Sequence, residues 1–216
     1  MKYTITNKIM ALIIIVALIV ISAILYNTVF KVEKVKTLKD AEIGNIVEFG
    51  SYEQDNNPKE KEAIRWIVID KQDNKLYLLS EKIIDVKQYE ENESGCIQWS
   101  DSSLRKWLNN DFLDESFSEE EVEKIISDNQ DEVSILSYDD VEKYLIESNY
   151  LLAQPSIFAD ENGLFYNAET KASNWWIKKN NYAASVESDG MILGLNNNGY
   201  EIAPEGVRPC MWVEVN

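Results

Sequence analysis

The chain of 216 residues contains 38 acidic and 21 basic residues and no histidine, so its formal net charge is −17. This acid excess repels phosphate backbones and argues against nucleic acid as a partner. Without histidine the chain has no Ser-His-Asp or Cys-His relay and no histidine zinc site, and two cysteines cannot complete a structural zinc site. We therefore expect no metal and no cofactor.

The N-terminal segment is typical of a membrane span. Ser22 is the single polar residue in the segment from Ile9 to Tyr26. A helix of this length would cross the hydrocarbon core of a bilayer. No small-residue cleavage site follows, so we favour an uncleaved signal anchor over a cleaved signal peptide. The expected organisation is a cytoplasmic N-terminus at 1–8, a transmembrane anchor at 9–30, a linker at 31–42 and an extracellular domain at 43–216.

The extracellular part is strongly acidic. The first thirty residues hold two lysines and no acid, so the net charge of −17 for the chain becomes −19 for the rest. The simplest interpretation is solubility of an exported domain, with a specific cationic partner as the alternative. The remaining length suits one domain with a sizeable core.

Strands are predicted in the first half of this domain at 43–52, 64–70 and 75–80, where β-branched and aromatic residues are frequent. The four residues 71–74 between the last two runs predict a hairpin turn. The apolar run then continues through 83–89 into a loop that carries Cys96.

The stretch from Trp99 to Phe112 predicts a helix around which the domain is organised. Ser100, Asp101 and Ser102 can accept hydrogen bonds from the first free amides. Apolar residues then recur at helical spacing, and Asn109 with Asn110 predicts a polar end. One apolar face therefore requires a sheet to cover it.

Two capping boxes predict two more helices. Ser118 with Glu121 begins a helix at 119–127, and Ser137 with Asp140 begins another at 138–147. A short buried strand at 133–136 lies between them. Carboxylates in these first turns are interpreted as partners of the helix dipole and not as catalytic acids.

A long segment at 149–174 lacks periodicity and contains Phe158, Phe165 and Tyr166. Loops of this length in compact domains are often binding segments. It is followed by predicted strands at 175–178, 182–187, 191–195, 200–203 and 207–215. Asp-Gly and Asn-Gly pairs separate several of them, which predicts a meandering antiparallel sheet.

The order of these segments resembles a bacterial family of exported or membrane-anchored domains of unknown function. The resemblance covers 43–216 and rests on WIVID, LYLLS, SLRKWLN, WWIKK and GVRPCMW, which begin at Trp66, Leu76, Ser103, Trp175 and Gly206. It implies an α+β fold similar to C-type-lectin-like domains and, more distantly, to formylglycine-generating enzymes. That build has antiparallel sheets with two or three short helices and a long loop region before the last strands.

Departures from these relatives limit the function. The Gln154-Pro155-Ser156 and Asn174-Trp175-Trp176 runs lack the carboxylates of a lectin calcium site. Lys178 and Cys210 stand where the family usually has arginine and alanine. Cys96 and Cys210 are expected to form a disulfide, with two buried free thiols as the alternative, and they do not fit the reactive pair of a formylglycine-generating enzyme.

The favoured function is a membrane-anchored binding module of a bacterial cell surface, without catalysis, for a protein, peptide or glycan. We expect its ligand contacts at Phe158, Phe165, Tyr166, Asn174 and Lys178. The tryptophans are expected in the core, with at most one of Trp175 and Trp176 exposed, and Arg208 beside a carboxylate.

Two alternatives remain for the function. One is a carboxylate-based hydrolase of surface glycans, with Asp160, Glu161 and Glu169 as candidate acids. The other is a structural subunit of a membrane complex that makes its contacts through residues 9–26.

Overall fold

The structure is a computed structural model that describes residue 15 and residues 35–91, 97–194 and 203–215. Its contacts divide the chain into one unit of residues 1–34 and a second of residues 35–216. Among the described residues, no helix combines the length and the apolar character that crossing a bilayer demands. The expected anchor at 9–30 lies outside the described residues except for Ile15, which is helical and exposed, and the anchor therefore stays a prediction.

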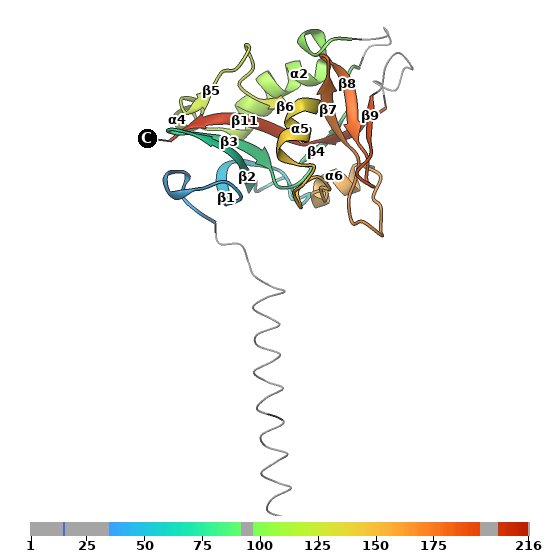
Figure 1. Cartoon of the computed structure of the whole chain (residues 1–216), viewed down its shortest axis with the longest axis horizontal. Coiled ribbons are helices and arrows are strands. Elements are labelled where there is room, and N and C mark those ends of the chain that lie inside the picture. Colours follow the sequence, from blue (N-terminus) through green and yellow to red (C-terminus); the bar gives the residue numbers. More distant parts are fainter. Residues whose placement is uncertain (1–14, 16–34, 92–96, 195–202, 216) are drawn as a thin grey trace, which may run out of the picture. The chain divides into compact units, whose positions relative to one another are not determined.

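The first sheet has the strand order β1-β2-β3-β11-β5, and β6 also pairs with β11. These strands pair antiparallel, and β11 runs between β3 and β5 (Figure 1). Their bounds are β1 (Ile46–Tyr52), β2 (Glu62–Gln72), β3 (Lys75–Ser80), β5 (Ile125–Ile126), β6 (Ser134–Ile135) and β11 (Pro209–Glu214). Alternation sends Trp66 into one apolar core and Ile67 into the other, so both faces of this sheet are buried.

The hairpin between β2 and β3 has a tighter turn than the four residues predicted. Pairing continues to Gln72 opposite Lys75, which leaves Asp73 and Asn74 as the turn. Asp73 has a φ of 51°, a left-handed conformation that aspartate tolerates.

The second sheet has the order β4-β10-β7-β8-β9. Its strands are β4 (Asp85–Lys87), β7 (Trp175–Lys179), β8 (Tyr182–Val186), β9 (Ile192–Gly194) and β10 (Glu205–Val207). The antiparallel meander from β7 to β9 confirms the prediction. It does not continue, because β10 pairs parallel with β7 and antiparallel with β4, and β11 joins the first sheet. The predicted Asn198-Gly199 turn lies outside the described residues.

Glycine is required where β10 crosses between β4 and β7. A Cβ on Gly206 would lie 2.6 Å from the Asn174 carbonyl oxygen and 2.6 Å from Ile83 Cγ2. The parallel bridge between Gly206 and Trp175 therefore depends on the missing side chain.

The helices are short. Their bounds are η1 (Leu38–Asp40), η2 (Trp99–Asp101), α2 (Ser103–Trp107), η3 (Leu108–Phe112), α3 (Leu113–Ser116), α4 (Glu119–Val122), α5 (Tyr138–Tyr144) and α6 (Ile157–Glu161). Both predicted capping boxes are present, at Ser118 and at Ser137. The predicted helix at 119–127 was too long, because Ile125 and Ile126 pair with β11. Likewise, α6 occupies part of the segment expected to lack secondary structure.

The organising helix begins where the sequence predicts and ends later. Ser102 caps α2 by accepting a hydrogen bond from the Arg105 amide. Asn109 and Asn110 do not end it, because a π-helical turn at 108–112 continues into α3. Their side-chain amides donate to carbonyl oxygens one turn earlier, those of Arg105 and Lys106.

Two apolar clusters cover the faces of the first sheet. Leu104, Leu108 and Phe112 of the organising helix join Trp66 and Trp176 in one cluster. Val141 of α5 joins Trp175 in the other. Trp175 and Trp176 thus face opposite sides as predicted, and both are fully buried, which agrees with the expectation that at most one of them is exposed.

Candidate functional site

A cavity with a volume of about 640 Å³ lies where the two sheets meet. Its lining combines Trp212 of β11, Lys178 of β7, Trp99 and the polar segment 128–132. Cavities of this size commonly hold small ligands. Most of the lining surface is polar, which suits a ligand rich in hydrogen-bonding groups.

Backbone hydrogen bonds hold the walls of this cavity in place. β6 pairs with β11 of the first sheet, and just beyond it the Leu136 carbonyl accepts a 3.0 Å bond from the Lys178 amide of the second. The Trp99 amide donates to the Asn181 carbonyl at 2.7 Å. Because each wall is tied to a sheet, the cavity is preformed.

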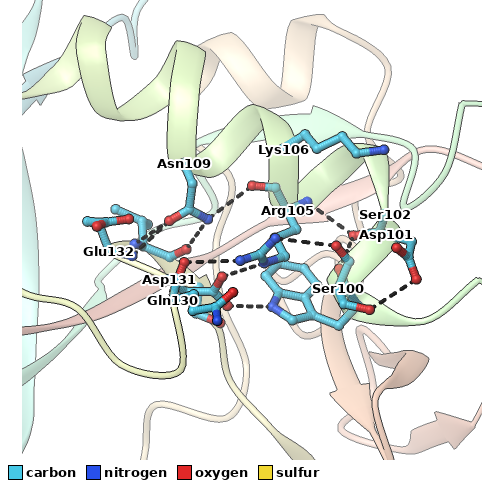
Figure 2. A network of polar contacts seen from close by, with 12 residues as sticks. Ser100, Asp101, Ser102, Arg105, Lys106, Asn109, Gln130, Asp131 and Glu132 are labelled. Carbon is cyan, nitrogen blue, oxygen red and sulfur yellow. Dashed lines mark hydrogen bonds and ion pairs between the residues drawn. The ribbon is translucent and has the colours of Figure 1, made fainter.

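Arg105 fastens the organising helix to the segment 128–132 (Figure 2). Its Nε donates to Asp131 Oδ1 at 2.5 Å, and its two Nη atoms donate to the carbonyl oxygens of Ser100 and Gln130. Trp99 Nε1 donates to the other Asp131 oxygen at 2.6 Å. The buried Asp131 carboxylate is therefore satisfied by two fixed donors.

Asn109 makes a second attachment one helical turn further on. Its side-chain oxygen accepts from the amides of Glu132 and Val133, and its nitrogen donates to the Val133 carbonyl at 2.8 Å. Figure 2 shows Arg105 and Asn109 side by side above this segment. Asn109, which was predicted to end the helix, is therefore a clamp that attaches the helix to the cavity wall at 132–133.

The clamped segment contains a strained turn. Asp128 and Asp131 exchange backbone hydrogen bonds of 2.8 and 2.9 Å. Between them, Asn129 and Gln130 have φ values of 51° and 72°, which is unfavourable for glutamine. Such strain persists where the surroundings impose it and is concentrated at functional sites. Both residues are exposed and line the cavity.

Lys178 is a half-buried cation in the same cavity. Its Nζ donates to Ser134 Oγ at 2.7 Å and lies 4.9 Å from the centre of the Trp99 ring. Among the described residues no carboxylate forms an ion pair with it, whereas Arg105 is paired with Asp131.

Tyr77 and Trp212 form an aromatic part of the lining, with parallel rings 4.7 Å apart. The Tyr77 hydroxyl lies 3.3 Å from Cys210 Sγ. Burial raises the pKa of the Cys210 thiol to about 12, so it is protonated and unreactive at neutral pH. Cys210 is a buried thiol, and because Cys96 lies outside the described residues, the expected disulfide stays a prediction.

Residues 73–215 match the family described as Domain of unknown function (DUF6273). The chain belongs to this family. No curated protein and no solved structure matches the chain. The DUF6273 match begins later than the expected position 43, so β1 and all of β2 precede it, but it includes the organising helix and the cavity lining.

Within the DUF6273 region, the five expected ligand contacts do not form one site. Phe165 and Tyr166 are 64% and 43% exposed. Phe158 packs on the core beside Tyr52. Asn174 bonds to the Glu187 carboxylate and the Ser188 amide. Lys178 alone of the five lines the cavity.

Sequence reasoning missed most of the cavity lining. Trp99 and Arg105 fell within the stretch predicted as a helix, and Asn129 fell between the predicted helix at 119–127 and the predicted strand at 133–136. A usable signal was the polar run from Ser127 to Glu132 between two short apolar segments.

Arg208 of the DUF6273 region differs from its prediction. It is 1% exposed, and its guanidinium donates to the carbonyl oxygens of Ser80 and Tyr150 at 2.9 and 2.6 Å. The Trp175 ring lies 5.0 Å away. The expected carboxylate partner is therefore replaced by carbonyl groups and an aromatic face. Burial lowers the pKa of Arg208 to about 9, so it stays charged at neutral pH.

A separate carboxylate group could hold a cation. Oxygens of Glu53, Asp55 and Glu62 lie within 4.8 Å of one another. These carboxylates already accept hydrogen bonds from nearby backbone amides, including those of Gln54 and Asn57. Their arrangement is explained by the loop that they stabilise.

Proposed function

We propose that this DUF6273 domain is a binding module whose ligand occupies the cavity between the two sheets. The observation that carries the proposal is a preformed cavity of about 640 Å³, closed on one side by a strained turn that Arg105 holds in place. Strain retained at an exposed turn is expected where the turn has a binding role.

Binding is favoured over catalysis because the buried Asp131 and the half-buried Asp140 of the lining are already occupied, while the other lining carboxylates, Asp128 and Glu132, are exposed and half-buried. Asp131 is held by Arg105 and Trp99. Asp140 accepts hydrogen bonds from the Ser137 amide and hydroxyl. Asp160, Glu161 and Glu169, the candidate acids of the hydrolase alternative, do not line the cavity.

We further propose a C-type-lectin-like build and an extracellular location behind an N-terminal anchor. Antiparallel sheets with short helices support the build, and the apolar residues 9–26 support the anchor. Protease added to intact cells that express the full chain should remove the domain. Full protection from the protease would contradict the location, and failure of an experimental structure to superpose on a C-type lectin domain would contradict the build.

The cavity can be tested with a matched pair of variants in the full chain. Ser100 and Asp101 are neighbouring exposed residues, and Ser100 alone of the two lines the cavity. An array of glycans and peptides should show binding that Ser100→Trp abolishes and Asp101→Trp preserves.

Other outcomes would revise the proposal. Binding retained by both variants would show that the cavity is not the site. Loss of binding in Phe165→Ser, with Ser100→Trp unaffected, would move the site to the 149–174 segment. An array without any binding would contradict the proposed function.

A further inference from the structure

The charges in the cavity are unevenly satisfied. Arg105 and Asp131 neutralise each other in an ion pair. Lys178 has a hydroxyl and an aromatic ring as partners, neither of which carries a negative charge. A half-buried ammonium group gains most from an anionic acceptor.

Other half-buried cations of the domain pair with carboxylates, with the exception of Lys179, which lies over the Tyr138 ring. Arg65 pairs with Glu81, and Lys87 pairs with the buried Asp85 at 3.2 Å. In a chain with 38 acidic residues, a carboxylate partner is readily available. Among the described residues no carboxylate pairs with Lys178, which leaves its ammonium group available to a ligand.

The rest of the lining fits a sugar. Asn129 and Gln130 bring planar amides that can pair with hydroxyl groups, and Trp212 stacked on Tyr77 adds an aromatic surface. Asp128 and Glu132 also line the cavity and can accept hydroxyl hydrogen bonds. Their negative charges disfavour a second acidic group on the ligand.

We propose that the cavity binds a sugar that carries one carboxylate, and that Lys178 donates to this carboxylate. This inference rests on the proposed binding function and specifies its ligand class. The sugar hydroxyls bond to the amides of the 128–132 segment, while the carboxylate supplies the acceptor that Lys178 lacks. Charge recognition therefore comes from the second sheet, and ring recognition comes from the first sheet and its turn between β5 and β6.

The test uses small probes and the full chain. Methyl glucuronide, methyl glucoside and N-acetylalanine are titrated by calorimetry, with ligand-observed NMR for weak binding. Methyl glucuronide should bind at least about tenfold more tightly than the neutral glucoside, a difference of about 1.4 kcal/mol. Lys178→Gln should abolish this preference, whereas Lys178→Arg should retain it.

Lys179 provides the matched control. It is the next residue of β7, it lies 3.7 Å from the Tyr138 ring, and it does not line the cavity. Lys179→Gln should bind methyl glucuronide like the unmodified chain. Thermal unfolding of each variant checks that the fold is retained.

Each contrary result has a separate meaning. Equal binding of glucuronide and glucoside, lost in Ser100→Trp, would overturn the acidic-sugar inference and leave the binding function standing. N-acetylalanine binding as tightly as methyl glucuronide would overturn the sugar assignment. If none of the probes binds, the inference fails, and the array then decides the broader function.

Discussion

Arg105 and Arg208 occupy contrasting surroundings in one domain. Arg105 lies at the cavity, keeps 23% of its side chain exposed and pairs with a carboxylate. Arg208 is completely buried, with carbonyl oxygens and a tryptophan ring as its partners. The first fastens one helix to one turn, and the second joins the end of β3 to Tyr150 and to Trp175 of the other sheet.

The contrast separates stability from function. A buried guanidinium without a carboxylate is costly unless its donors are satisfied, so Arg208 is expected to be essential to the sheet arrangement. A half-buried ion pair contributes less to stability. Arg105 is therefore expected to matter chiefly for the conformation of the cavity wall.

The largest effect is expected for Arg208→Met, which fills similar volume but removes the hydrogen-bond donors to Ser80 and Tyr150. Urea unfolding should show a loss of about 2 to 4 kcal/mol in the free energy of unfolding. Arg65→Met, at a partly exposed ion pair, should cost less than about 1 kcal/mol. Equal losses of unfolding free energy in Arg208→Met and Arg65→Met would contradict the special role of the buried arginine.

Arg105→Met should cost about 1 to 3 kcal/mol, because the buried Asp131 carboxylate loses its guanidinium partner. It should also weaken binding in the cavity by more than its effect on stability explains, since the strained turn is released. Lys106→Met, on the exposed face of α2, is the control for both measurements. Unchanged binding by a folded Arg105→Met chain would show that the clamp has no functional role.

Glu205 extends the comparison to a half-buried acid. Burial, together with the charge of Glu187, raises the pKa of Glu205 to about 7. The folded state then holds this proton more tightly than the unfolded state, so stability falls as pH rises from about 4.5 to about 7.

Glu205→Gln should therefore be more stable than the unmodified chain at pH 8, by about 1 to 2 kcal/mol after allowance for partial solvent exposure. The two chains should agree more closely at pH 4. Denaturation at both values, with Glu48→Gln as an exposed strand control, provides the measurement. An unchanged pH dependence would refute the assignment.

Local features of the fold were predictable from the sequence. Ser102, Ser118 and Ser137 were recognised as helix starts because capping uses neighbouring residues. β3 was predicted at its observed bounds because alternation and turn residues are local as well. The mixed α+β class follows from these elements.

Features set by distant contacts were not predictable in this way. The pairing of Ile125 and Ile126 with β11 ended a predicted helix early. The cavity draws Trp99, Asn129, Lys178 and Trp212 from four separate segments. No local sequence pattern indicates that these four segments come together. Sequence reasoning therefore favoured the loop that contains Phe165 and Tyr166 as the binding site.

The position of β11 has a consequence for biosynthesis. It completes the first sheet between β3 and the pair β5 and β6, although it is the last described strand in the chain. During translation, this sheet cannot close until residue 214 has left the ribosome. Until then the apolar edge of β3 is available to chaperones and to unwanted partners, and nascent chains stopped before residue 209 should be aggregation-prone.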